Sequence, residues 1–373
     1  MAATWENRRW TLCLRDGSQV NARVVVWGTG ALHRPAVPDL PGLSEFQGRV
    51  FHSAHWDHDH DLRGRRVAVV GTGASAIQFV PAIQPQVAHL TLFQRTPPWV
   101  LPKPDGPVPA RLRRLYRALP LAQRLQRALV YARNEAVVAG FLRPSRMAVI
   151  ERFARAYLDR RFADRPDLKA RLTPDFTIGC KRILLSNDYY PALKQPNVDL
   201  VTEKIVSVTP TGVVTADGVE HAADTIVLGT GFKVADGLKS IPITGRDGVR
   251  LSDAVEGFLG TTIAGFPNLF VLTGPNTGVG HSSMIFMIES QLNYVLDALR
   301  LLDERGAVAL DTRRDRQDAY TPACSTGSTA RCGSPAGARA GTSTRTGATA
   351  RSGPTTRSGS GTAPAGSAPG TTN

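Results

Sequence analysis

The chain has 373 residues, 42% of them hydrophobic, and is long enough for two domains with separate cores. The net charge of +14 suits a nucleic acid or an anionic membrane, but no aromatic strand motif or finger-like ligand spacing accompanies it, so we expect no nucleic-acid binding. Four cysteines without a C-x-x-C pair argue against a disulfide scaffold, and no apolar run is of membrane-spanning length, so we expect a cytoplasmic protein.

The first elements are strands. Trp10–Leu14 and Val20–Trp27 flank an Asp16-Gly17 turn and predict a hairpin that feeds a buried strand. Gly28, Thr29 and Gly30 end that strand. The proline-rich connector at 35–41 is typical of a crossing between domains.

A strand, a glycine turn and a helix follow at 67–83. The apolar run Val67–Val70 predicts a buried parallel strand, and Ile77–Ile83 predicts a helix. Between them, Gly71-x-Gly73-x-x-Ala76 matches a dinucleotide fingerprint, in which the first glycine permits a tight turn and the second admits a pyrophosphate. We therefore expect the turn to bind the cofactor at a helix N-terminus. Its residues are Gly71, Thr72, Gly73, Ala74, Ser75 and Ala76.

The end of the next strand selects the cofactor. An NAD site usually carries an acidic residue about 20 residues beyond the glycines. The strand at 89–94 is instead followed by Arg95 and Thr96, and a guanidinium suits a 2′-phosphate. We therefore expect NADP.

A helical stretch is predicted from about Pro109 to Leu172, rich in arginine, as in Arg111-Leu-Arg-Arg-Leu-Tyr-Arg117. We interpret this charge as the solvated face of a helix, with an anionic membrane as the alternative. Strands at 198–214, 224–232 and 268–275 and a helix at 283–302 complete the pattern. Glycine turns after strands, at 28, 71 and 229, indicate two dinucleotide-binding sheets.

A second motif lies before the glycine turn. Phe46, Gly48, His52, Trp56 and Asp57 match the pattern F-x-G-x-x-x-H-x-x-x-W-[PD]. The pattern is the fingerprint of Baeyer–Villiger monooxygenases, and the chain resembles this flavoprotein family from about Ala3 to about Arg305. The Gly274–Ser283 run resembles its aryl-ketone (4-hydroxyacetophenone) branch.

The resemblance implies an α/β fold with two Rossmann-like domains, an FAD domain interrupted by an NADP domain. It implies that FAD, NADPH and O2 insert one oxygen into a ketone, through a peroxyflavin, to give an ester or lactone. Arg182 matches the catalytic arginine and Lys181 a neighbouring NADP contact. The implied FAD contacts are Gly28, Thr29, Gly30, Gly229, Thr230, Gly231, Gly274, Pro275 and Asn276, and the fingerprint residues lie at the interdomain crossing.

We expect four segments. Residues 1–60 form a partial FAD domain and linker, 61–224 an NADP domain with a helical insertion at about 109–172, 225–310 a return to the FAD domain, and 311–373 a low-complexity tail. The tail has no large aliphatic or aromatic residue from Thr321 onward, so we expect it to be disordered. The family's first Gly-x-Gly-x-x-Gly has no counterpart here. We therefore expect an incomplete FAD domain and a chain inactive as given.

Three alternatives stay open. The chain could oxidise nitrogen or sulfur, like other flavin monooxygenases, or bind NADP(H) without catalysis. The cluster of His52, His55, His58 and His60 with Asp57, Asp59 and Asp61 could hold a divalent metal. Because its members belong to the fingerprint or to a polar linker, we expect no metal.

Overall fold

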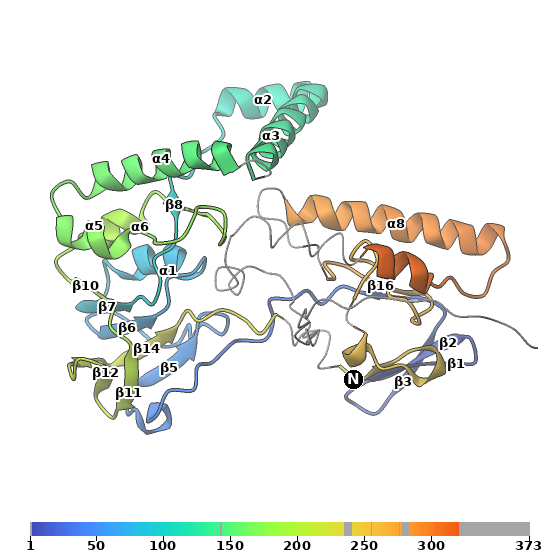
Figure 1. Ribbon diagram of the computed structural model, residues 1–373, viewed down its shortest axis with the longest axis horizontal. Coiled ribbons are helices and arrows are strands. Elements are labelled where there is room, and N and C mark those ends of the chain that lie inside the picture. Colours follow the sequence, from blue (N-terminus) through green and yellow to red (C-terminus); the bar gives the residue numbers. More distant parts are fainter. Residues whose placement is uncertain are drawn as a thin grey trace, which may run out of the picture.

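The computed structural model describes residues 2–141, 144–234, 241–254, 256–275, 277 and 283–320, without the side chains of 137–146. Asn276 and the tail from Thr321 onward, for which predictions were made, lie outside these residues. The described chain forms two lobes, each with its own sheets (Figure 1).

The first lobe is built on a five-stranded parallel sheet in the order β10-β7-β6-β14-β5. Its strands are β5 (Arg49–His52), β6 (Arg66–Val70), β7 (His89–Phe93), β10 (Val198–Val201) and β14 (Thr225–Leu228). Helix α1 (Ala76–Ile83) connects β6 to β7. Parallel strands with a helical crossover confirm the predicted α/β class.

Both faces of this sheet are covered, which explains the uninterrupted apolar strands. Val67 and Val69 of β6 pack into a core with four helices, whereas Ala68 between them packs into a core with an antiparallel meander. The helices are α1, α4 (Pro144–Arg161), α5 (Pro166–Leu172) and α6 (Tyr189–Leu193). The meander consists of β11 (Ile205–Thr209), β12 (Gly212–Thr215) and β13 (Glu220–Ala222).

The sheet crosses the boundaries that the sequence suggested. Sequence analysis assigned β5 to the segment 1–60 and β14 to the segment 225–310. In the structure, β14 pairs in parallel with both β5 and β6, so both strands belong to this sheet. The repeated strand-then-glycine pattern at 229 suggested a return to another domain because the pattern does not reveal a strand's neighbours.

The second lobe contains two smaller sheets. Strands β15-β1-β2-β3 form one, and β4 pairs in parallel with β16 in the other. Their bounds are β1 (Ala2–Glu6), β2 (Arg9–Cys13), β3 (Gln19–Ala22), β4 (Val25–Trp27), β15 (Ile243–Thr244) and β16 (Leu269–Val271). The predicted hairpin at Asp16-Gly17 is confirmed, since it joins β2 to β3. The strand that follows is less buried than expected, because β16 is the only described neighbour of β4 and Val26 is 44% exposed.

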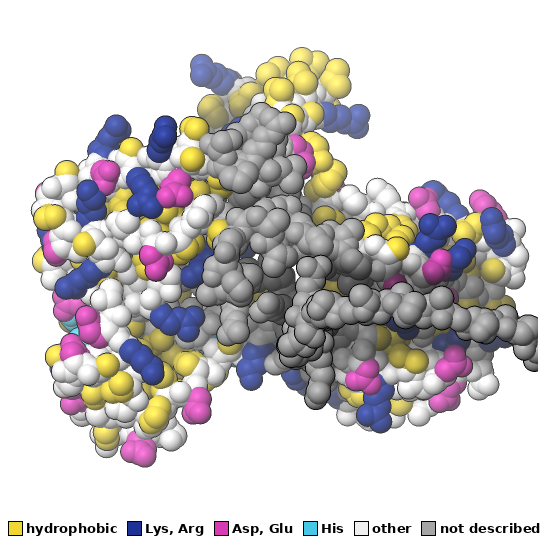
Figure 2. All heavy atoms as spheres, in the orientation of Figure 1, with side chains coloured by type: hydrophobic (Ala, Val, Ile, Leu, Met, Phe, Trp, Pro, Cys, Tyr) yellow, Lys and Arg dark blue, Asp and Glu magenta, His cyan; other side chains and the backbone are white. Residues whose placement is uncertain are grey.

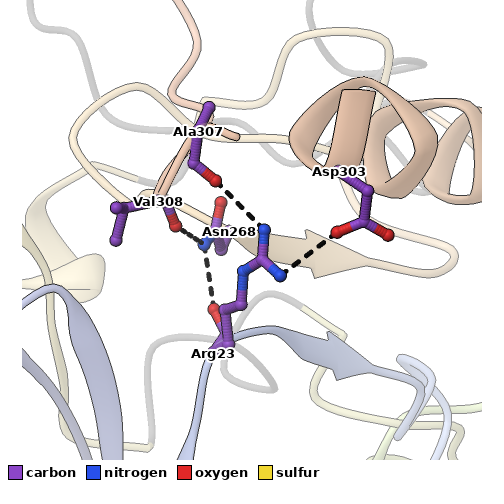
Figure 3. Close-up of polar contacts among 5 residues, drawn as sticks. All are labelled: Arg23, Asn268, Asp303, Ala307 and Val308. Atoms are coloured by element: carbon purple, nitrogen blue, oxygen red, sulfur yellow. Dashed lines mark hydrogen bonds and ion pairs between the residues drawn. The ribbon is translucent and has the colours of Figure 1, made fainter. Parts of the chain in front are cut away.

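Helix α8 (Met284–Glu304) closes the second lobe and begins where predicted, with the Ser283 side chain accepting a hydrogen bond from the Ile285 amide. Its far end is fastened to the segment between β3 and β4 (Figure 3). The Arg23 guanidinium contacts Asp303 at 3.2 Å and donates to the Ala307 carbonyl at 3.0 Å. The buried Asn268 amide donates to the carbonyls of Arg23 and Val308 at 2.9 and 3.0 Å. These bonds hold the short β4–β16 sheet against α8.

The two chain segments that run between the lobes pair with each other. The amide of Ala36 donates to the Gly231 carbonyl at 2.9 Å, and that of Lys233 donates to the Arg34 carbonyl at 2.9 Å. The Thr230 hydroxyl donates to the Ala36 carbonyl at 2.6 Å. The predicted connector therefore runs beside the segment after β14.

The predicted helical stretch is confirmed as α2 (Ala110–Ala118), α3 (Pro120–Phe141), α4 and α5. Helices α4 and α5 bury apolar side chains such as Leu158 and Leu172 against the sheet. Helices α2 and α3 stand away from it (Figure 1). In α3, the Arg127 guanidinium meets Glu289 of α8 at 2.8 Å, and Tyr131 lies on Phe286 with ring centroids 4.8 Å apart.

Candidate functional site

The turn from Gly71 to Ala76 joins β6 to α1 at the carboxyl end of the parallel sheet. Gly71 has φ of 109°, and a Cβ atom there would lie 2.5 Å from the carbonyl oxygen of Gly229. Ala76 is fully buried, and its Cβ lies 3.7 Å from the position of a Cβ on Gly229. Gly71, Ala76 and Gly229 are therefore small because the ends of β6 and β14 and the start of α1 meet here.

Gly73 differs from Gly71. A Cβ atom on Gly73 would meet no atom within 4 Å, so the chain's own packing does not require a glycine there. The amides of Ile77, Gln78 and Phe79 in the first turn of α1 already donate to the carbonyls of Gly73 and Ser75. Those of residues 73–76 have no backbone acceptor among the described residues, and the helix dipole favours negative charge at this end. An open backbone beside a helix N-terminus fits the pyrophosphate of a dinucleotide.

The residues after β7 lie against this turn, as predicted. The Thr72 hydroxyl donates to the Thr96 carbonyl at 3.2 Å. Gln94 is 2% exposed, and its Nε2 donates to the Arg171 carbonyl at 2.8 Å. Arg95, between these anchored neighbours, is exposed and forms no ion pair with a described residue. Its guanidinium is therefore available for an anion beside the glycine turn.

The loop between α5 and β9 (Leu184–Leu185) carries the predicted catalytic arginine. It is tied to the segment after Arg95, because β8 (Val100–Leu101) pairs with β9 and the Trp99 indole donates to the Phe176 carbonyl at 2.9 Å. Lys181 Nζ lies 4.4 Å from the centroid of the Phe176 ring. Arg182 is exposed and has no ion pair or hydrogen bond with a described residue, so its five N–H donors are free.

The predicted site residues are not all in contact with one another in the structure. Among the described residues, no hydrogen bond or ion pair joins Lys181 or Arg182 to the Gly71–Ala76 turn. A hydrogen bond joins that turn to Thr96, the residue after Arg95, whereas the loop that carries Lys181 and Arg182 is connected to this region through the pairing of β8 with β9.

The fingerprint residues have separate structural roles. Phe46 is buried beneath the meander, and a Cβ atom on Gly48 would lie 2.3 Å from the Asp224 carbonyl oxygen. Trp56 packs on Phe79 of α1, with ring centroids 5.4 Å apart. Asp57 forms an ion pair with Arg49 at 2.6 Å, and this hydrogen bond lowers the pKa of the Asp57 carboxyl.

His52 connects the fingerprint to the segment between the lobes. Its ring meets that of Phe232 edge-on, with centroids 5.7 Å apart, and its Nδ1 accepts a hydrogen bond from the Ala54 amide at 3.0 Å. The side chain is 5% exposed, and burial lowers the pKa of its imidazole. The neutral ring is thus favoured where the chain passes toward the second lobe.

The candidate FAD glycines fall into two groups. Gly30 and Gly231 have positive φ, and a Cβ atom on either would meet no atom within 4 Å, while one on Gly28 would meet only a Leu272 methyl group, at 3.8 Å. Gly274 is closely packed, since a Cβ there would lie 2.5 Å from the Gly260 carbonyl oxygen. The turn at Gly229–Gly231 follows β14 of the five-stranded sheet, whereas Thr29 follows β4 and Pro275 follows β16 in the second lobe.

The histidine and aspartate cluster does not converge. His60 Nε2 lies 2.8 Å from the Thr225 hydroxyl, His52 packs on Phe232, and Asp57 pairs with Arg49. Within the described part of the chain, no three histidine, cysteine or acidic side chains are placed to share a metal ion.

Sequence analysis missed one residue that shapes the second lobe. Gln291 of α8 is 3% exposed, and its Oε1 accepts a hydrogen bond from the Thr273 amide at 2.9 Å. Its Nε2 donates to the Gly260 carbonyl at 2.9 Å and contacts the Thr261 hydroxyl at 3.0 Å. Gln291 therefore fixes the turn before Gly274. A glutamine in line with the buried Val295 of α8 was the available signal.

Known proteins resemble this chain over most of its length. Residues 10–237 match the family described as flavin-binding monooxygenase-like. A Baeyer–Villiger monooxygenase of Pseudomonas aeruginosa is 50% identical over 85% of this chain, and one of Streptomyces coelicolor is 50% identical over 84%. The chain spans 61% of the length of each of these relatives. The structure of OTEMO in complex with FAD and NADP superposes with a TM-score of 0.77 at 26% identity, covering 88% of this chain and 72% of that one.

Proposed function

Because this chain belongs to the flavin-binding monooxygenase-like family, we propose that it acts as an NADPH- and FAD-dependent monooxygenase, which inserts one oxygen atom of O2 into a ketone. The product is an ester or a lactone. The observation that carries the proposal is the fingerprint at 46–57, whose Trp56 packs on the helix of the glycine turn and whose His52 packs on the segment between the lobes. The names of the two relatives at 50% identity support it.

NADPH binds at the carboxyl end of the five-stranded sheet. The backbone is open at Gly73, and the amides of residues 73–76 donate hydrogen bonds to the pyrophosphate. Arg95, beside Thr96, binds the 2′-phosphate through charge-assisted hydrogen bonds. Lys181 is a secondary contact, because its ammonium already lies over Phe176.

FAD belongs to the second lobe and the segment between the lobes. Gly28, Gly30 and Gly231 fit a closely approaching ligand, because a side chain at each would point into open space or touch one methyl group. Gly274 contributes by holding the turn after β16 against Gly260. The first lobe is thus the NADP domain, now including β5 and β14, and the second lobe belongs to the FAD domain.

Arg182 is the residue that acts on the reacting atoms. Bound FAD and NADPH would supply the redox chemistry that reduces O2, which leaves binding, orientation and charge stabilisation to the protein. The Arg182 guanidinium donates hydrogen bonds to the negative charge that develops on oxygen as it is transferred to the carbonyl carbon. Its lack of a carboxylate partner among the described residues leaves it free for this role.

The substrate class follows from the resemblance of the 274–283 run, of which 276 and 278–282 lie outside the described residues, to the aryl-ketone branch. We therefore choose an aryl methyl ketone as the first substrate. The protein is purified with FAD, supplied with NADPH and 18O2, and assayed for an ester that carries one labelled oxygen. That product would support the proposal and would overturn the expectation that the chain as given is inactive.

Each other result identifies an alternative. Oxidation of a tertiary amine or sulfide without any ester would assign the protein to heteroatom chemistry. NADPH binding without flavin-dependent NADPH oxidation would make it a binding module, and the proposal would be wrong.

A further inference from the structure

The described part of the chain covers little of the helical pair α2–α3. None of the residues of α2 is buried, and none of the described side chains of α3 is buried. The pair projects from the first lobe, and Figure 2 shows apolar side chains gathered on it, with Lys or Arg side chains at either end. A helix of a water-soluble domain normally buries its apolar face, so an exposed apolar face indicates a binding surface.

Three exposed leucines of α3 form one stripe. Leu121, Leu125 and Leu129 recur every four residues and are 75%, 61% and 58% exposed. At 3.6 residues per turn, Ala128 and Ala132 fall on the same side. In α2 and just after it, Leu115 and Leu119 are 41% and 57% exposed. The three leucines of α3 are therefore an apolar stripe, and the α2 region exposes two further leucines.

The contact with α8 uses a different side of α3. Arg127 pairs with Glu289 and Tyr131 lies on Phe286. At about 100° per residue, Arg127 lies roughly 120° from Leu121 around the helix and Tyr131 roughly 80°, both on the side away from Leu129. Contacts among the described residues thus leave the leucines exposed.

The charge of the pair is strongly positive. Residues 110–136 contain seven arginines and one glutamate, which gives a net charge of +6. The arginines are Arg111, Arg113, Arg114, Arg117, Arg124, Arg127 and Arg133. Of these, Arg127 alone forms an ion pair with a described residue. Leucines combined with unpaired arginines are typical of helices that lie in the interface of an anionic bilayer.

Helix α8 provides the contrast. It also exposes two leucines four residues apart, Leu292 and Leu296, at 41% and 50%. It carries four acidic residues and one arginine between 284 and 304, however, and so has a net charge of −3. Apolar exposure alone does not distinguish the two helices, whereas charge does.

We propose that α2–α3 docks on an anionic lipid surface, with the leucines in the headgroup region and the arginines on lipid phosphates. No helix in the described part of the chain is long and apolar enough to cross a bilayer, so the helices lie along the surface. A nucleic acid would use the arginines but leave the leucines in water. A second copy presenting the same pair would bring two sets of like charges together.

The test is co-sedimentation of the full chain with vesicles of phosphatidylcholine alone or with 30% phosphatidylglycerol. The wild type should bind the anionic vesicles and not the neutral ones. Leu121→Gln/Leu125→Gln should reduce the partition coefficient by at least about tenfold, since two leucines no longer enter the apolar layer. Arg113→Gln/Arg117→Gln should reduce it roughly thirtyfold, from about 1 kcal/mol for each charge.

Two matched controls should bind like the wild type. Leu292→Gln/Leu296→Gln changes the same spacing of exposed leucines on α8, and Arg152→Gln/Arg160→Gln removes two exposed arginines from α4. Circular dichroism of each variant verifies the fold. Equal loss in the control pairs, or no binding of the wild type to anionic vesicles, would overturn the proposal. Analytical ultracentrifugation without lipid, showing a dimer that Leu121→Gln/Leu125→Gln dissociates, would assign the face to a second copy instead.

Discussion

The carbonyl oxygen of Gly229 lies 2.5 Å from the point that a Cβ atom on Gly71 would occupy, so the turns after β6 and β14 meet without room for a methyl group. Two strands distant in sequence thereby share one glycine contact. At Gly73, two residues further along, the corresponding space is empty. The fingerprint glycines thus have different functions, one in packing and one facing outward.

Replacing each glycine by alanine should separate these functions. Gly71→Ala should destabilise the protein by roughly 2–4 kcal/mol, because it adds a clash to a strained positive φ. Gly73→Ala should change stability by less than about 0.5 kcal/mol but weaken NADPH binding. Urea denaturation and fluorescence titration measure the two effects. Equal losses of stability in the two variants would contradict the assignment of Gly73 to the ligand.

Arg95 should determine the preference for NADPH over NADH. Arg95→Ala should cost about 1.5–3 kcal/mol of NADPH binding, the range for hydrogen bonds to a charged group, and leave NADH binding almost unchanged. Arg95→Lys should recover part of the loss, since it keeps the charge but not the two-pronged geometry. Titration calorimetry with both cofactors checks this, with the exposed Arg152→Ala on α4 as the control. Parallel losses for both cofactors would refute the role.

Arg182 should affect oxygen transfer and not cofactor binding. In the FAD-loaded protein, Arg182→Ala should leave NADPH oxidation in place and lower ester formation by about 10²–10³-fold, because the developing oxyanion loses its donor. The measurement is the amount of ester formed per NADPH consumed. Arg182→Lys should retain more ester than Arg182→Ala. An unchanged ratio in Arg182→Ala would remove this residue from the reaction.

His52 should make the stability of the protein depend on pH. Burial lowers the pKa of His52 in the folded protein below the 6.5 of an exposed imidazole, so below about pH 6.5 the unfolded chain binds more protons. Stability should therefore fall as the pH drops below 6.5 toward the folded pKa. Protonation at Nδ1 also removes the hydrogen bond from the Ala54 amide.

Urea midpoints at pH 7.5 and 5.5 test this dependence. His52→Gln should show a smaller decrease between the two pH values than the wild type, whereas the exposed His58→Gln should follow the wild type. An identical decrease in His52→Gln would mean that the buried imidazole does not carry the effect.

The local chemistry of the site could be predicted from the sequence. The run of strand, glycine turn and helix at 67–83 depends on residues that are neighbours in the chain, and the structure forms it as β6, the turn and α1. Arg95 and Thr96 follow the adjacent strand of the parallel sheet, and in the structure the Thr72 hydroxyl donates to the Thr96 carbonyl beside that turn. Periodicity also predicted the helices from 109 to 172 and at 283–302.

Other features were decided by tertiary structure, because they depend on segments far apart in the chain. The membership of β5 and β14 in one sheet arises from hydrogen bonds across more than 150 residues, which no local pattern encodes. The division of the glycines into packed and open positions depends on which carbonyl lies opposite each one. An amphipathic pattern predicts an apolar face on α3 but not which segment packs against that face. In the described structure Leu121, Leu125 and Leu129 stay exposed.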